Sequence, residues 1–248
     1  MRGIFAAFIH PRESPTDVGY ASQATSDKYN VAGFCFAGVG LNGAATLENF
    51  VATGWDYEKD ELRILNPATC ASAKRLVWLT KEEAEGGEVG TKAGWYDASE
   101  YTYEGNLEFD LGSGFLTSLS SKGVSFTYSG EVFNDSLTIP CDGKKYVIIP
   151  NALPRTITLS EVIATGWDYE KDELRKLNKT NSASAQRYVW LSKEEAEGGE
   201  VGDKAGWYDA SEYSYEGAQE VLSGEGFLTS ISSKNVMISL PASVPAAE

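Results

Sequence analysis

The chain contains one long sequence twice, and this repeat limits what it can fold into. The decapeptide Gly-Trp-Asp-Tyr-Glu-Lys-Asp-Glu-Leu-Arg at 54–63 recurs at 166–175, and Gly-Trp-Tyr-Asp-Ala-Ser-Glu at 94–100 recurs at 206–212. The two members of each pair are 112 residues apart. This period exceeds the about 20 to 50 residues of solenoid repeats and matches the size of one small domain. We therefore interpret the chain as an internal duplication of a folded unit.

The repeat also sets the domain boundaries that we expect. Two units of 112 residues fit the 248-residue chain at 17–128 and 129–240. They leave an N-terminal apolar head at 1–16 and a C-terminal tail at 241–248. A hydrophobic content of 42% is enough for a packed core in each unit.

Composition narrows the range of partners. The formal net charge is −15, and an acidic surface repels a phosphate backbone, so we expect no nucleic-acid partner. The apolar run at 4–9 is far shorter than the about 20 residues that cross a bilayer, so no membrane insertion is expected. The same head lacks a convincing small-residue cleavage site of a secretory signal peptide.

The cysteines do not follow the repeat. None of Cys35, Cys70 and Cys141 has a cysteine at the matching position of the other unit. A disulfide framework older than the duplication would be present in both units, so the fold is not expected to depend on one. A single disulfide with one remaining free thiol is the alternative that the sequence allows.

Short runs rich in aromatic and β-branched residues alternate with Gly, Asn and Ser, a pattern typical of an all-β protein. Short helical turns are expected at 80–83 and 158–161, where the sequence fits a capping box. With no long amphipathic helix, the pattern favours two tandem β-sandwich-like units. The strands expected in the first unit, each recurring 112 residues later, are 18–22, 31–37, 61–65, 75–80, 94–97, 101–104, 115–120 and 124–129.

The junction between the units has no evident linker. The segment 125–132 leads directly into the first strand of the second unit, which predicts rigid coupling. The equivalent closing strand at 236–240 has no third unit to enter. We therefore expect its edge to be open, and an open edge favours association with another strand.

The two units have diverged unevenly. The segments 54–105 and 166–217 differ at 10 of 52 positions, whereas 28–50 and 140–162 agree at only three. Inside the similar block, Ile64 is replaced by Lys176 and Leu76 by Tyr188. These exchanges suggest that the same surface is buried against a neighbour in the first unit and exposed to solvent in the second.

Little in the chain points to catalysis. His10 is the only histidine and lies outside the repeat, which argues against histidine-based catalytic or metal sites. No phosphate-binding glycine loop is present. The acidic clusters at 56–61 and 97–104 are expected to be solvated faces, with weaker alternatives as glycosidase carboxylates or a Ca²⁺ site. We expect no enzyme, no cofactor and no metal site, apart from that weak Ca²⁺ possibility.

All six tryptophans fall in the similar block, in two sets of three. Trp78 and Trp95 are expected in the core, because large aromatic side chains dominate core packing. Trp55 and Tyr57, with Trp167 and Tyr169, are candidates for an exposed aromatic surface that stacks on sugar rings. Tyr96, Tyr101 and Tyr103 are expected to extend this surface.

Several short motifs occur in the first unit at 18–20, 29–34, 94–97, 112–115 and 129–132. The second unit matches the Gly-Trp-Tyr-Asp motif at 206–209 and the Gly-x-Gly-Phe motif at 224–227, but lacks the Ser-Gly-Glu-Val motif of 129–132. With these motifs the chain resembles a family of uncharacterised bacterial β-rich tandem-repeat proteins that are usually secreted. The resemblance implies an extracellular or surface role and no known reaction.

Together these patterns predict a structural subunit of an extracellular or cell-surface filament, sheath or lattice that associates with itself through strand edges. In this hypothesis the apolar head adds to the open closing strand of a neighbouring molecule. A carbohydrate-binding surface module is the alternative. The residues expected to carry assembly are Ile4, Phe5, Phe8, Ile9, Val236, Ile238 and Leu240.

Overall fold

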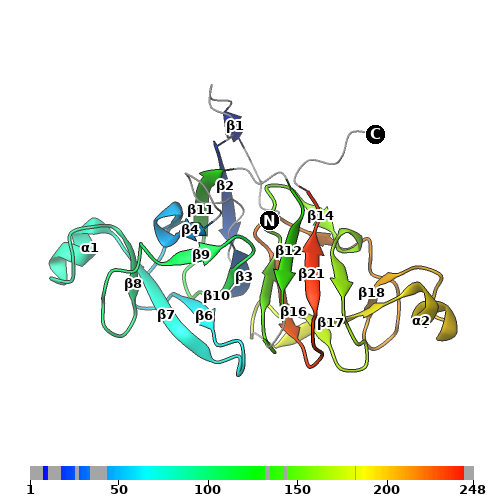
Figure 1. Ribbon diagram of the computed structural model, residues 1–248. Coiled ribbons are helices and arrows are strands. Elements are labelled where there is room, and N and C mark those ends of the chain that lie inside the picture. Colours follow the sequence, from blue (N-terminus) through cyan, green and yellow to red (C-terminus); the bar gives the residue numbers. More distant parts are fainter. Residues whose placement is uncertain are drawn as a thin grey trace.

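The computed structural model describes residues 8–10, 18–25, 28–33, 44–131, 135–141, 144–181 and 183–242. The fold is all-β, as expected, with antiparallel sheets and two short α-helices. Two lobes lie side by side, and the helices lie at opposite ends of the molecule (Figure 1). No helix in the described ranges is long and apolar enough to cross a membrane.

The first lobe is a sandwich of a four-stranded and a five-stranded sheet, joined by a small two-stranded one. The four-stranded sheet has the order β1 (Phe8–His10), β2 (Val18–Thr25), β11 (Val124–Glu131) and β5 (Phe50–Thr53). The five-stranded sheet has the order β3 (Tyr29–Gly33), β10 (Gly114–Ser118), β6 (Glu61–Leu65), β7 (Ser72–Leu79) and β8 (Gly94–Asp97). The small sheet pairs β4 (Ala44–Thr46) with β9 (Glu108–Asp110).

The second lobe repeats this plan. Its first sheet has the order β12 (Leu137–Pro140), β21 (Met237–Leu240) and β15 (Ile163–Thr165). Its second has the order β13 (Ile148–Pro150), β20 (Gly226–Ser230), β16 (Glu173–Leu177), β17 (Ser184–Leu191) and β18 (Gly206–Asp209). The small sheet pairs β14 (Ile157–Thr158) with β19 (Glu220–Val221).

Each lobe has one helix, α1 (Lys81–Gly86) or α2 (Lys193–Gly198), and one 3₁₀ turn, η1 (Leu47–Asn49) or η2 (Leu159–Glu161). The expected capping boxes are present: Thr80 Oγ1 accepts from Glu83 N at 3.2 Å, and a Glu83 carboxylate oxygen accepts from Thr80 N at 2.7 Å. Gly87 follows the last residue of α1 and is its C-cap. The expected strand at 101–104 is wrong, because Tyr103 forms only an isolated bridge to Tyr96.

Each sandwich is filled by aromatic and aliphatic side chains from both sheets. Trp95 is fully buried, as expected for the core, and its indole nitrogen donates to the Phe50 carbonyl at 2.5 Å. In the second lobe Trp207 donates to the Val162 carbonyl at 2.7 Å. These bonds tie the five-stranded sheet of each lobe to the strand opposite it.

The lobes meet through their five-stranded sheets, in a symmetric way. Tyr29 N donates to the Lys179 carbonyl at 2.9 Å, and Tyr146 N donates to the Pro67 carbonyl at 2.7 Å. An apolar cluster of Val31, Ile148, Leu177 and Leu228 lies between them. A Cβ atom on Gly33 would lie 2.3 Å from the Pro150 side chain, so glycine is needed for this close approach.

The junction between the lobes is not the continuous strand expected from the sequence. β11 runs to Glu131, past the expected boundary at 128, in the first lobe. β12 begins at Leu137 in a different sheet of the second lobe. The two lobes are instead coupled by the contact between their five-stranded sheets.

The pairing corrects the alignment of the repeats near their starts. Val31 pairs with Leu116, and Ile148 pairs with Leu228, so Ile148 occupies the position of Val31. The offset there is 117 rather than 112, and it matches Lys28-Tyr29 with Lys145-Tyr146. The poor agreement at offset 112 is therefore a shift in alignment in this segment.

Candidate functional site

An open pocket lies beside the helix in each lobe. One is lined by Tyr57, Leu79, Glu83, Gly86, Gly87, Val89 and Tyr101, and has a volume of about 480 Å³. The other is lined by Tyr169, Leu191, Glu195, Gly198, Gly199, Val201 and Tyr213, and has a volume of about 500 Å³. The seven residues of one pocket are identical to those of the other at an offset of 112. Both volumes fall within the range of small-molecule sites, about 300 to 1,000 Å³.

The wall of the pocket is built on the outer face of the five-stranded sheet. Along β7, Leu76 faces the sandwich core, whereas Val77 and Leu79 belong to a second apolar cluster beneath α1. Tyr57 and Val89 pack against this second cluster. Because both faces of β7 are covered, its apolar residues run consecutively instead of alternating with polar ones.

The capping box and the turn after the helix shape the rim. α1 begins after Thr80, and Val89 N donates to the Ala84 carbonyl at 3.0 Å, which folds the chain back toward the sheet. A Cβ atom on Gly86 would meet no atom within 4 Å, so this glycine faces open space. α1 and α2 lie at opposite ends of the molecule (Figure 1), so the two pockets do too.

The second tyrosine of each pocket has an unusual backbone. Tyr101 has φ 53° and Tyr213 has φ 54°, the left-handed region that bulky side chains rarely adopt. Their side chains are also among the exposed large hydrophobic ones, at 38% and 37%. A strained, exposed aromatic residue at the same place in both lobes is a feature that packing alone does not explain.

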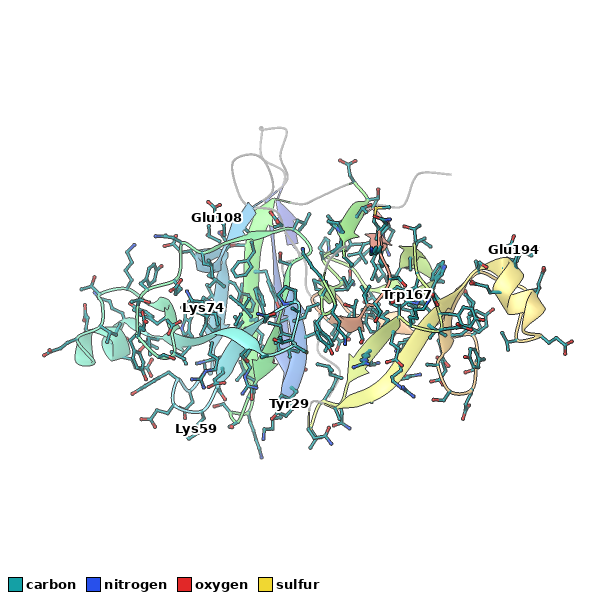
Figure 2. All side chains as sticks on the ribbon, turned by 60° about the horizontal axis from the view of Figure 1, so that its bottom comes forward. Tyr29, Lys59, Lys74, Glu108, Trp167 and Glu194 are labelled. Atoms are coloured by element: carbon teal, nitrogen blue, oxygen red, sulfur yellow. The ribbon has the colours of Figure 1, made fainter. Side chains whose placement is uncertain are left out.

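The structure separates the aromatic residues that were predicted as one sugar-stacking surface. Tyr57 and Tyr169 line the pockets. Trp55 instead packs edge-on against Trp95, with ring centroids 5.1 Å apart, and Trp167 packs in the same way against Trp207 at 5.0 Å. Figure 2 shows Trp167 against the sheets of the second lobe, far from Glu194 on the helix. The two tryptophans are therefore partly buried, packed against the core of each lobe, and lie outside the pocket linings.

The indole nitrogens of Trp55 and Trp167 are buried and have no hydrogen-bond partner among the described residues. Neither residue lines either pocket.

One aspartate in the first acidic cluster of each lobe has a structural role that the sequence interpretation missed. Asp60 is fully buried, and its carboxylate accepts from the backbone N–H groups of Asp56, Ser120 and Ser121 at 2.9, 2.7 and 3.0 Å. The expectation of a solvated face is wrong for Asp60 and for Asp172, which has equivalent bonds. In the described ranges no group of three or more His, Cys, Asp and Glu residues is placed to hold a metal ion.

Other carboxylates of these clusters make ion pairs at the surface. A hydrogen bond from Lys59 is the main cause that holds the pKa of Asp56 below its usual value. Glu61 binds Arg63 at 2.9 Å and Arg75 at 3.1 Å.

The residues expected to carry assembly do not form an open edge. β21 is the central strand of its sheet, paired with β12 on one side and β15 on the other. Val236, Ile238 and Leu240 are buried in the core of the second lobe. The expected open closing strand is therefore wrong, because β12 and β15 cover both of its edges.

The head of the chain is described only in part. Phe8 and Ile9 lie in β1, which pairs with β2 of the same chain. Ile4 and Phe5 lie outside the described residues, as does Cys35. The segment 8–10 therefore extends the first sheet of its own lobe.

The sequence interpretation included Tyr57 and Tyr101 in an aromatic surface, but it missed Glu83 and the glycine pair as parts of a pocket. One signal was available: the decapeptide Lys-Glu-Glu-Ala-Glu-Gly-Gly-Glu-Val-Gly is identical at 81–90 and 193–202. This identical segment forms an exposed helix and turn, where packing sets few constraints and surface positions usually tolerate change. No protein-family model, curated protein or solved structure matches this chain.

Proposed function

We propose that this chain is a non-enzymatic, bivalent glycan-binding protein with one binding pocket in each lobe. The observation that carries the proposal is the pair of pockets, similar in volume and lined by the same seven residues. Apolar side chains with a few convergent polar groups are typical of small-molecule sites. Two pockets at opposite ends would let one molecule bridge two chains of a polymeric ligand.

The chemistry of the pocket suits a sugar ring. Tyr57 and Tyr101 offer aromatic faces to the apolar face of the ring, and Leu79 and Val89 extend that surface. The Glu83 carboxylate and the peptide groups of Gly86 and Gly87 provide acceptors for hydroxyl groups. A bridging role fits the extracellular or cell-surface location expected from the sequence, which remains part of the proposal.

The proposal is tested on a glycan array with the full chain and two kinds of variant. Tyr101→Asn with Tyr213→Asn removes two aromatic rings, and Asn tolerates a left-handed backbone. Gly86→Leu with Gly198→Leu keeps every tyrosine but puts a side chain into the open space. We expect the glycan affinity of both double variants to fall by about tenfold or more. Their melting temperatures should be no lower than that of the wild type.

Trp55→Phe with Trp167→Phe is the matched control, because these residues line neither pocket. It should keep binding. The absence of any wild-type glycan binding, or its survival in the blocked Gly86→Leu and Gly198→Leu variant, would contradict the proposal.

Self-association through strand edges is a second candidate function, which one observation favours. Val51 and Ile163 are 38% and 42% exposed at matching positions of the edge strands β5 and β15. An exposed apolar edge favours pairing with another chain. Light scattering should then show oligomers that Val51→Lys and Ile163→Lys dissociate. A monomeric wild type up to high concentration would end this proposal.

A further inference from the structure

We infer that both pockets select sugars that carry a free amino group, so that the natural ligand is a cationic amino-sugar polymer. This inference rests on the proposed function and names the class of glycan. It starts from the charges around the pocket.

The pocket contains negative charge that has no cationic partner in the described part of the chain. Glu83 is the only charged residue in its lining, and one carboxylate oxygen accepts from Thr80 N at 2.7 Å. The other oxygen accepts no hydrogen bond from a described residue. Lys81, the helix's basic residue, pairs with Glu85 at 3.6 Å instead of Glu83. A ligand cation would therefore meet an uncompensated carboxylate.

The other polar groups of the pocket are acceptors as well. The carbonyl oxygens of Gly86 and Gly87 accept no hydrogen bond from the described residues, since Glu88, Val89 and Gly90 donate to carbonyls earlier in α1. An ammonium group has three donors and no acceptor, and therefore matches such a set of acceptors.

Aromatic faces add to this preference. A cation within about 6 Å of a tyrosine ring centroid is attracted by the ring quadrupole. The chain already makes such contacts beside the pocket, where Lys92 Nζ lies 5.3 Å from the ring centroid of Tyr103. Its equivalent in the second lobe is Lys204 over Tyr215, at 5.6 Å. Among the described residues, no lysine lies over the ring of Tyr57 or Tyr101, and both residues line the open pocket.

The charge of the whole chain acts in the same direction. A net charge of −15 attracts cations and repels acidic glycans such as uronic-acid polymers. This long-range attraction is screened by salt, with a Debye length of about 8 Å at physiological ionic strength. Selectivity for an amino group at the pocket should persist in salt, whereas the long-range attraction should not.

The test compares two ligands that differ only at the nitrogen. The full chain is titrated with a glucosamine tetramer and with its fully N-acetylated counterpart, at pH 6 and 150 mM salt. We expect the free amine to bind at least about tenfold more tightly. Acidic uronic-acid oligomers should not bind.

A matched pair of variants locates the effect. Glu83→Gln with Glu195→Gln removes the pocket charge while keeping the capping box, because Gln also fits its third position. Glu82→Gln with Glu194→Gln removes the same charge from the same helices at residues outside the pocket lining; Glu194 projects from α2 at the end of the molecule (Figure 2). We expect the first pair to lose the preference for the free amine and the second pair to keep it.

The outcomes separate the two proposals. Equal binding of both tetramers would overturn the inference and leave glycan binding in place. Binding of neither tetramer would overturn the inference, and a glycan array that is also blank would overturn the proposed function. Equal loss of amine preference in both Gln pairs would show that net charge alone is responsible, which overturns the assigned role of Glu83.

Discussion

At the scale of single residues, Asp60 and Asp172 show how a charged side chain can be a core residue. Each carboxylate is fully buried and accepts hydrogen bonds from three backbone N–H groups. In the first lobe these bonds link the segment 56–60 to residues 120–121, which follow β10. The sequence could not reveal this, because Asp60 stands among acidic residues that are exposed or half-buried. Which carboxylate turns inward depends on contacts about 60 residues away.

We predict that Asp60→Ala destabilises the chain strongly. The substitution leaves buried N–H groups without an acceptor, at about 1 to 3 kcal/mol for each such group, so a loss of about 3 kcal/mol or more is expected in urea unfolding. Glu58→Ala, in the same run but exposed, should change the unfolding free energy by less than about 0.5 kcal/mol. Equal effects of the two substitutions would contradict this role of Asp60.

Equivalent space in the two cores is filled by aromatic rings that come from different strands. In the first lobe Phe50 of β5 stacks on Phe115, with centroids 5.4 Å apart. In the second lobe Phe50 is replaced by Val162, and Tyr188 of β17 packs on Phe227 at 5.8 Å instead. Leu76 and Tyr188 are both fully buried, so the expectation that one of them is wet is wrong.

This exchange predicts a strong coupling between two positions. Leu76→Tyr alone overfills the first core and should cost about 1 to 3 kcal/mol. Combined with Phe50→Val, it reproduces the ring arrangement of the second lobe and should cost less than the sum of the two single substitutions by at least about 1 kcal/mol. Unfolding free energies of the four chains give the double-mutant cycle; additive values would show that the two positions are independent.

At the scale of elements, the sequence located the strands that are long, apolar and bounded by turns. β6 and β8 begin and end as expected, and both capping boxes are present. β4, β5 and β9 were missed because each has only three or four residues, too few for a period to show. The equally short β8 was found because it consists of the repeated Gly-Trp-Tyr-Asp motif. The pocket could not be predicted from the sequence in this way. Its residues come from a turn, a helix end and a strand, which only the tertiary fold brings together.

The contact between Tyr103 and the 3₁₀ turn η1 is expected to make the free energy of unfolding fall at high pH. The Tyr103 hydroxyl donates to a Glu48 carboxylate oxygen on η1 at 2.8 Å. Burial, followed by this carboxylate, raises the pKa of Tyr103 from 10.0 to about 12. A folded-state pKa above the unfolded value means that the folded chain holds the proton more tightly. The contribution to stability is therefore full below pH 10 and is lost as the pH rises from 10 to 12.

Tyr103→Phe should consequently flatten the fall in unfolding free energy between about pH 10 and 12. Circular dichroism in urea at several pH values measures it. Tyr215→Phe is the control, because position 160, which matches Glu48 in the second lobe, is a serine. An unchanged slope in Tyr103→Phe would contradict the assigned contribution.

At the scale of the whole molecule, the symmetric contact between the five-stranded sheets makes the two lobes one unit. Its apolar cluster and paired backbone hydrogen bonds predict a single cooperative unfolding transition, with coincident curves from tryptophan fluorescence and circular dichroism. Val31→Asp buries a charge in this cluster and should separate the transition into two. Two transitions in the wild type would show that the lobes fold independently.

The repeat in the sequence predicts two similar lobes. It does not predict how the two lobes contact each other. The shift in offset from 112 to 117 at β13 hides the matching Lys-Tyr pairs, which lie at or just before the strands β3 and β13. The backbone N–H groups of both tyrosines make hydrogen bonds between the lobes.

The proposed function requires two equivalent ligand pockets, one in each lobe. An NMR titration of the full chain by the glucosamine tetramer, with the tyrosine rings isotopically labelled, tests for them. The ring signals of Tyr57, Tyr101, Tyr169 and Tyr213 should shift with one common affinity, and in Gly86→Leu only those of Tyr169 and Tyr213 should still shift. Shifts at rings elsewhere, or in one lobe only of the wild type, would contradict the proposed function.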